Sequence, residues 1–219
     1  MNSQEIKPIY PKNLGWLEYK LNSKEMDYVW RCIENKKDNC TKDLAGNISA
    51  SYDLMDRGDW FFTNCLRPVI DTYSNEFTNL GAGVGIPPIH PYKLTSWWVS
   101  YQKKNEFFSY HHHSGIYSFV IWMKIPYSYR DQNIISKLAD KVSGVSPKNS
   151  NTRSGCFEFN YPDILGNTTR SEYKLDKNWE GNMVFFPSRL PHAVYPFYNS
   201  DEDRISVAGN ITFDTSKIL

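Results

Sequence analysis

Three consecutive histidines and one distant histidine are the residues of this chain best suited to bind a metal ion. The chain has only five histidines, and four of them are His111, His112, His113 and His192. Phe107 and Phe108 precede the run, and aromatic residues are enriched in strands. The sequence therefore predicts that the run lies on or beside a β-strand.

Strand geometry decides which of the consecutive histidines can act together. Alternate side chains of a strand point to the same face, so His111 and His113 share a face and His112 points away. A His-x-His pair of this kind is a common chelating arrangement, and neutral imidazole suits zinc, iron, copper or nickel. A third ligand must come from elsewhere, and His192 is the candidate. His90, in a proline-rich segment, is interpreted as structural.

An arginine stands at the head of an apolar stretch twelve residues after His192. Burying its guanidinium without a partner is costly, so Arg204 needs either a salt bridge at a sheet edge or a bound carboxylate. The planar guanidinium matches the geometry of a carboxylate. Ser206 shares the face of Arg204 by the same two-residue rule.

Helices and strands must position these residues. Asn22 and Glu25 form an expected capping box at the start of a first helix. A second helical stretch is predicted over 59–77, bent or split at Pro68. Strands are predicted at 97–102, 117–125, 183–186, 193–195 and 205–213, and the polar segment 131–153 is expected to be a long excursion bordering the site. This order predicts a mainly β fold with N-terminal helices, a sandwich or jelly roll.

The bulk composition is that of an ordinary globular protein. A chain of 219 residues suits one domain, which we expect to span 1–219 with a helical support layer at 1–80 and a jelly-roll core at 94–213. Aromatic residues make up 16%, which favours sheet. The net charge of +1 gives no electrostatic case for nucleic acid as a partner.

Cysteine usage and the N-terminal segment bear on localisation. The four cysteines form no C-x-x-C pair, which is typical of free thiols in a reducing compartment. The N-terminal segment is neither a signal nor a transit peptide. No apolar run approaches the roughly 20 residues that span a bilayer. We therefore expect a cytoplasmic protein without a membrane partner, and a homodimer is compatible with the sequence.

At this point the chain resembles the Fe(II)/2-oxoglutarate-dependent oxygenases, most closely the microbial and phage-type branch related to prolyl hydroxylases. The resemblance is carried by 98–104, 110–120, 181–188 leading to His192, and 204–206, with 44–48 as a further piece. These pieces cover 94–213 with gaps, over half of the chain. Each is weak alone, and their order and spacing together are fairly specific.

The resemblance implies a double-stranded β-helix, a cupin-like jelly roll, with Fe(II) held inside one mouth by three side chains. 2-Oxoglutarate and O2 occupy the remaining positions on the metal. The far carboxylate of 2-oxoglutarate meets Arg204, with Ser206 as a helper hydroxyl and Tyr101 as a further contact. The implied reaction hydroxylates an unknown substrate, a small molecule or a peptide, and releases succinate and CO2.

One departure from the family pattern concerns the ligands. The usual facial triad is two histidines and one carboxylate. If His111 is the first ligand, His113 occupies the carboxylate position, and a face of His111, His113 and His192 leaves the site one unit more positive. Alternatively, His113 is the first ligand and Gly115 occupies the acid position, as in halogenating members of the wider family. The histidine run has two other interpretations: His112 has a binding role, or the site holds no metal.

Two rival functions remain open at this point. A cupin-type three-histidine dioxygenase would use O2 without 2-oxoglutarate, and Arg204 would then have no co-substrate to bind. A non-catalytic jelly-roll binding module would bind no metal, and the histidine run would be surface decoration.

Overall fold

The strands of this chain form two antiparallel sheets in the computed structural model, which describes residues 7–9, 13–44, 46–78, 80, 92–132 and 153–215. The six-stranded sheet has the order β1-β9-β6-β11-β4-β3, and the five-stranded sheet has the order β2-β5-β10-β7-β8. The six-stranded sheet comprises β1 (Leu17–Lys20), β3 (Ala50–Asp53), β4 (Tyr92–Gln102), β6 (Tyr117–Lys124), β9 (Asn182–Pro187) and β11 (Arg204–Phe213). The five-stranded sheet comprises β2 (Gly46–Asn47), β5 (Phe107–His111), β7 (Cys156–Pro162), β8 (Thr168–Lys174) and β10 (His192–Val194). The predicted jelly roll of mainly β structure is confirmed.

Helix α1 (Ser23–Glu34) begins at the predicted capping box. The Glu25 backbone N–H donates to Asn22 Oδ1 at 3.1 Å, and the Asn22 backbone N–H donates to a Glu25 carboxylate oxygen at 2.9 Å. Two backbone donors that a helix start leaves free are therefore satisfied reciprocally. The prediction of this helix is confirmed.

The second helical stretch is not split at its proline, but it changes there from π-helical to α-helical. A π-helical turn (Phe62–Leu66) leads directly into α2 (Arg67–Glu76). Pro68 is the second residue of α2, and it has no backbone N–H to donate to the π-helical turn that precedes it. The proline-rich segment with His90, at 81–91, and positions 133–152 of the predicted excursion lie outside the described residues.

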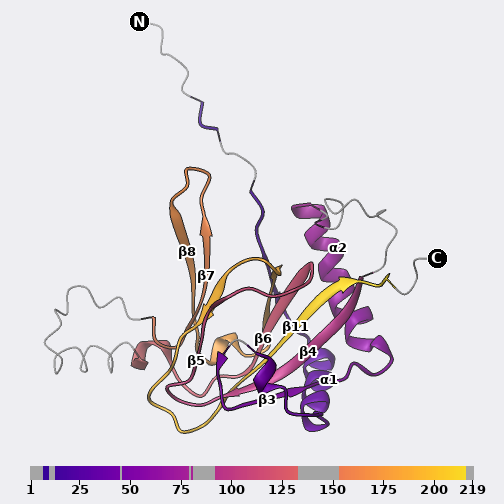
Figure 1. Ribbon diagram of the computed structural model, residues 1–219, viewed down its shortest axis with the longest axis vertical. Coiled ribbons are helices and arrows are strands. Elements are labelled where there is room, and N and C mark those ends of the chain that lie inside the picture. The colour runs from indigo at the N-terminus through magenta and orange to yellow at the C-terminus, as the bar shows by residue number, and fades with distance from the viewer. Residues whose placement is uncertain are drawn as a thin grey trace, which may run out of the picture.

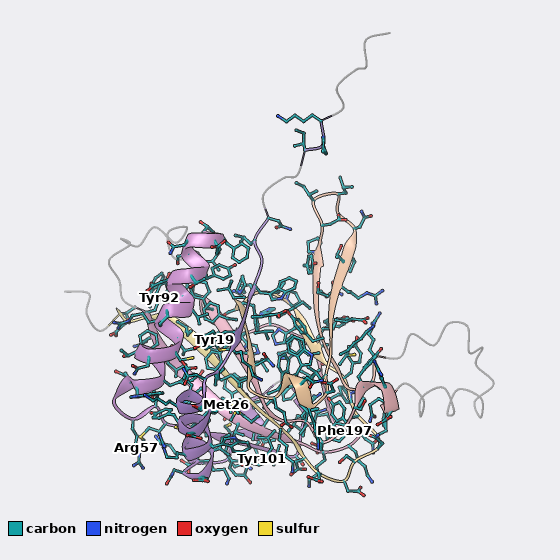
Figure 2. All side chains as sticks on the ribbon, turned by 180° about the vertical axis from the view of Figure 1, so that it is seen from behind. Tyr19, Met26, Arg57, Tyr92, Tyr101 and Phe197 are labelled. Atoms are coloured by element: carbon teal, nitrogen blue, oxygen red, sulfur yellow. The ribbon has the colours of Figure 1, made fainter. Side chains whose placement is uncertain are left out.

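Two hydrophobic cores lie on opposite faces of the six-stranded sheet. Helices α1 and α2 cover one face, where Val29 and Tyr73 pack with Phe119 of β6 (Figure 1). The other face meets the five-stranded sheet, where Trp122 of β6 packs with Phe157 of β7. Strand β6 is buried on both faces because it lies between the helices and the five-stranded sheet. Side chains fill the space on either side of the six-stranded sheet (Figure 2). Among the described residues, no helix combines the length and apolar character needed to cross a bilayer.

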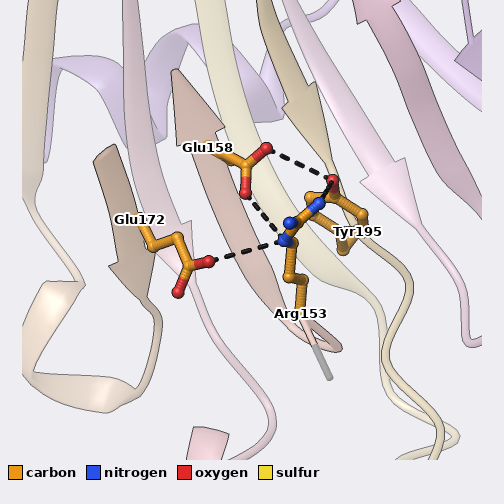
Figure 3. A network of polar contacts seen from close by, with 4 residues as sticks. All are labelled: Arg153, Glu158, Glu172 and Tyr195. Carbon is orange, nitrogen blue, oxygen red and sulfur yellow. Dashed lines mark hydrogen bonds and ion pairs between the residues drawn. The ribbon is translucent and has the colours of Figure 1, made fainter. Parts of the chain in front are cut away.

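A polar network lies on the far face of the five-stranded sheet (Figure 3). Glu158 alternates with Phe157 and Phe159 on β7, so its carboxylate points away from the core between the sheets. Arg153 Nε lies 3.0 Å from the buried Glu158 carboxylate and 3.4 Å from that of Glu172. Tyr195 accepts a hydrogen bond from Arg153 at 3.1 Å. Arg153 thereby links β7, β8 and the segment after β10.

Candidate metal centre

Three histidines meet where β5 and β10 pair. His192, the first residue of β10, lies directly opposite His111, the last residue of β5. His113 follows two residues later, and the three side chains each offer a nitrogen within 4.8 Å of the others. His112 between them is exposed. The spatial grouping of His111, His113 and His192 agrees with the alternation expected from the sequence.

A glycine turn returns the chain after His113 to the six-stranded sheet. The His113 backbone N–H donates to Ser188 O at 2.8 Å, and the Ile116 N–H donates to Ile211 O at 2.8 Å. Gly115 has φ +108°, a conformation that favours glycine. A Cβ at this position would lie 2.8 Å from Ile211 O. Gly115 is therefore explained by this turn.

The hydrogen bonds of the three rings determine which nitrogen is free. Nδ1 of His111 lies 2.7 Å from Ser109 O, and Nδ1 of His192 lies 2.9 Å from Leu190 O. Nδ1 of His113 lies 2.8 Å from Asn210 Oδ1. Because these oxygens only accept, each Nδ1 carries a proton and each Nε2 keeps a lone pair in the neutral ring. Three imidazoles in this form suit Fe(II), zinc, copper or nickel.

Burial keeps these rings neutral. Desolvation lowers the pKa of His111 and lowers that of His192 well below its usual range. The pKa of His113 is lowered to about 4, again mainly by desolvation. Neutral imidazole is the form that binds a metal ion, so the three rings are ready to do so at neutral pH.

A cavity between the sheets adjoins the histidines. Its walls include Trp98 and Ser100 of β4, Phe157 of β7, and Ser206 of β11. Ser206 pairs with Ser100, and Arg204 pairs with Gln102, so all four side chains belong to the same face of the sheet. Arg204 therefore lies on the cavity side of β11, two residues before Ser206 in the chain.

Arg204 is a buried cation with neutral partners. Its side chain is 1% exposed, and it donates to the Tyr127 hydroxyl at 2.5 Å and to Gln102 Oε1. Its Nε has no hydrogen-bond acceptor. Within the described part of the chain, no carboxylate forms an ion pair with Arg204. A buried guanidinium in this state suits an anionic ligand such as a carboxylate.

The structure does not bring Tyr101 to this cavity, and the expected contact with 2-oxoglutarate needs correction. Tyr101 pairs with Ile205, whose side chain packs on the helix side of the sheet. Its ring lies 6.0 Å from that of Tyr52, between centroids, in the same layer. Alternation along β4 places Gln102 on the cavity side instead.

Three residues near the site were missed by sequence reasoning. Gln102 and Asn210 follow the same two-residue alternation as Trp98 and Ser206, so this rule could have found both. Tyr127 follows the end of β6, where strand alternation no longer applies. Its contact with Arg204 could therefore be found only from the structure.

Comparison with known proteins places this geometry in a family. Residues 95–210, more than half of the chain, match the family model described as "Putative 2OG-Fe(II) oxygenase". Among curated proteins, no sequence matches this chain.

Solved structures with a similar fold include two prolyl hydroxylases. A prolyl-4-hydroxylase from Pseudomonas putida is 14% identical with a TM-score of 0.52, over 91% of this chain and 92% of its own. A prolyl hydroxylase from Trichoplax adhaerens, in complex with a hypoxia inducible factor peptide fragment, is 14% identical with a TM-score of 0.52, over 93% of this chain and 84% of its own.

Proposed function

Because the chain belongs to the 2OG-Fe(II) oxygenase family, we propose that His111, His113 and His192 hold its Fe(II) and that Arg204 and Ser206 hold 2-oxoglutarate. The family uses Fe(II), 2-oxoglutarate and O2. Bound iron supplies the oxidation of a substrate C–H bond, coupled to conversion of 2-oxoglutarate and O2 into succinate and CO2. One observation carries the assignment: three neutral imidazoles, each with a nitrogen within 4.8 Å of the others, lie at a cavity on the Arg204 side of the sheet.

In this proposal the chain's own residues divide the work of binding. The three Nε2 lone pairs hold the metal, and their Nδ1 protons stay on fixed acceptors, which keeps the rings oriented. Arg204 offers its unpartnered Nε to the far carboxylate of 2-oxoglutarate, and Ser206 adds a hydroxyl donor. Phe157 and Val194 wall the cavity with apolar surface and exclude water around these polar groups.

The geometry favours this ligand set over its alternatives. A halogenase-like site would have His113 first and Gly115 at the acid position, but His111 lies close to both other histidines, with its ring centroid 4.3 Å from that of His192. A three-histidine dioxygenase without 2-oxoglutarate would give Arg204 no anion to neutralise. Burial of Arg204, with no ion pair to a carboxylate among the described residues, therefore supports use of 2-oxoglutarate.

The second substrate is proposed to be a peptide or a small molecule. The two solved structures described above are prolyl hydroxylases, one of them bound to a peptide fragment, so a prolyl peptide is the first candidate to test. We further propose that 1–219 forms one oxygenase domain, with 1–80 supporting the core at 94–213. Four buried, unpaired cysteines support the cytoplasm as its compartment.

The proposal is tested by metal binding and by turnover. Purified protein with Fe(II) and ascorbate should convert 2-oxoglutarate to succinate even without a substrate. His111→Ala and His192→Ala should abolish both Fe(II) binding and succinate formation. The neighbouring His112→Ala is the matched control and should retain both. Succinate formation that survives in His192→Ala would contradict the ligand set.

A further inference from the structure

His113 differs from the other two histidines in what holds its ring. His111 and His192 donate Nδ1–H to backbone carbonyls, which any residue at those positions supplies. His113 donates instead to the side chain of Asn210, at 2.8 Å. Its orientation therefore depends on the identity of one residue on β11.

The Asn210 amide is itself held in one orientation. Its Nδ2 donates to Ser96 Oγ at 3.3 Å, and its Oδ1 also accepts from Ser118 Oγ at 2.9 Å. These contacts direct Oδ1, the acceptor, towards His113.

A second serine extends this chain of hydrogen bonds. Ser118 gives its only hydroxyl proton to Asn210, so in its 2.8 Å contact with Ser188 it accepts, and Ser188 donates. Ser118 and Ser188 are both fully buried. The backbone carbonyl of Ser188 also accepts from the His113 N–H. The ring and the backbone of His113 are thus fixed by one connected network.

We propose that Asn210 is the positioning residue that allows His113 to serve as a ligand where related sites have a carboxylate; this rests on the proposed metal centre. A carboxylate ligand carries no N–H. An imidazole ligand has an N–H pointing away from the metal, and in a buried site this donor needs an acceptor. Asn210 supplies that acceptor, so His113 and Asn210 form a pair in which each residue requires the other.

The pairing is tested by Co(II) binding to the metal-free protein, measured by calorimetry and by the visible absorption of the bound ion. Asn210→Ala should weaken Co(II) binding about 10- to 100-fold, as the loss of a partner of a ligating histidine generally does. Asn210→Asp keeps an acceptor and should bind at least as tightly as wild type. Asn182→Ala is the matched control: it removes a strand asparagine that donates to Asn178 O at 3.0 Å, and binding should not change.

A double-mutant cycle separates positioning from general damage. In a His113→Asp background the ligand has no N–H to satisfy, so adding Asn210→Ala should change Co(II) affinity by less than about threefold. Equal losses in both backgrounds, or wild-type affinity in Asn210→Ala, would overturn the inference while leaving the metal centre intact. Wild-type protein that binds no Co(II) would overturn the metal centre itself. If Asn210→Ala does not fold, Asn210→Leu removes the acceptor with less loss of volume and carries the same expectations.

Discussion

Replacing Arg204 by methionine should stabilise the metal-free protein and weaken the binding of 2-oxoglutarate to the Fe(II)-loaded protein. The guanidinium is 1% exposed, and Tyr127 and Gln102 offer it only neutral acceptors. An uncompensated buried charge costs several kcal/mol. Methionine fills similar space without a charge, so the folded state no longer bears this cost.

The magnitude follows from what each partner loses. Tyr127 still donates to Gly155 O at 2.9 Å in the variant, and Gln102 Nε2 still donates to Glu106 O at 2.5 Å. Gln102 Oε1 loses its donor, which costs about 1–2 kcal/mol. Against a charge burial of about 3 kcal/mol, the net gain in unfolding free energy is about 1–2 kcal/mol. Loss of the charge-assisted hydrogen bond from Nε to 2-oxoglutarate, about 1.5–3 kcal/mol, corresponds to an affinity about 10- to 100-fold weaker.

Two measurements check that Arg204→Met raises stability and lowers the affinity for 2-oxoglutarate. Urea denaturation of metal-free protein reports the unfolding free energy, and anaerobic calorimetry of the Fe(II)-loaded protein reports the affinity for 2-oxoglutarate. Arg31→Met, an exposed arginine on α1, is the control and should change neither. A metal-free Arg204→Met protein that is less stable than wild type, or that binds 2-oxoglutarate normally, would refute the reasoning and make Arg204 an ordinary structural residue.

Two further substitutions test the network around Arg153 and the turn after His113. Arg153→Met should lower the unfolding free energy by about 2 kcal/mol at pH 8, because it leaves the Glu158 carboxylate buried without its cation. Burial raises the pKa of Glu158, so the loss should shrink as pH falls and the carboxyl takes up a proton; equal losses at pH 5 and pH 8 in urea denaturation would contradict this. Gly115→Ala should cost about 1–3 kcal/mol and weaken metal binding, since a Cβ would lie 2.8 Å from Ile211 O. Gly166→Ala, at φ +83° with open space around it, should cost less and leave metal affinity unchanged in the same calorimetric titration.

Alternation along strands accounts for which side chains of the site could be predicted to act together. It paired His111 with His113, and Arg204 with Ser206, because successive side chains of any strand point to opposite faces. It could not say which face of β4 meets the cavity. Both faces of that strand are largely buried, so apolar residues do not mark one side, and alternation could not test the contact with Tyr101 that the family resemblance implied.

Residues outside regular strands were beyond this reasoning. Tyr127 reaches Arg204 from the segment after β6, and its position depends on how that segment folds back over the sheet.

The hydrogen bond between His113 and Asn210 joins residues 97 positions apart. Only the pairing of β6, β9 and β11 brings them together.

The placement of the histidines across the two sheets has a consequence for the lifetime of the protein. His111 and His192 belong to the five-stranded sheet, whereas Ser188 and Asn210 tie His113 to the six-stranded sheet. An ion held by the proposed ligand set therefore cross-links the two sheets, and the sheets cannot separate unless the ion is released. Because a ligand that binds only the folded state stabilises that state increasingly as its free concentration rises above Kd, scarcity of iron would make the chain easier to proteolyse as well as inactive.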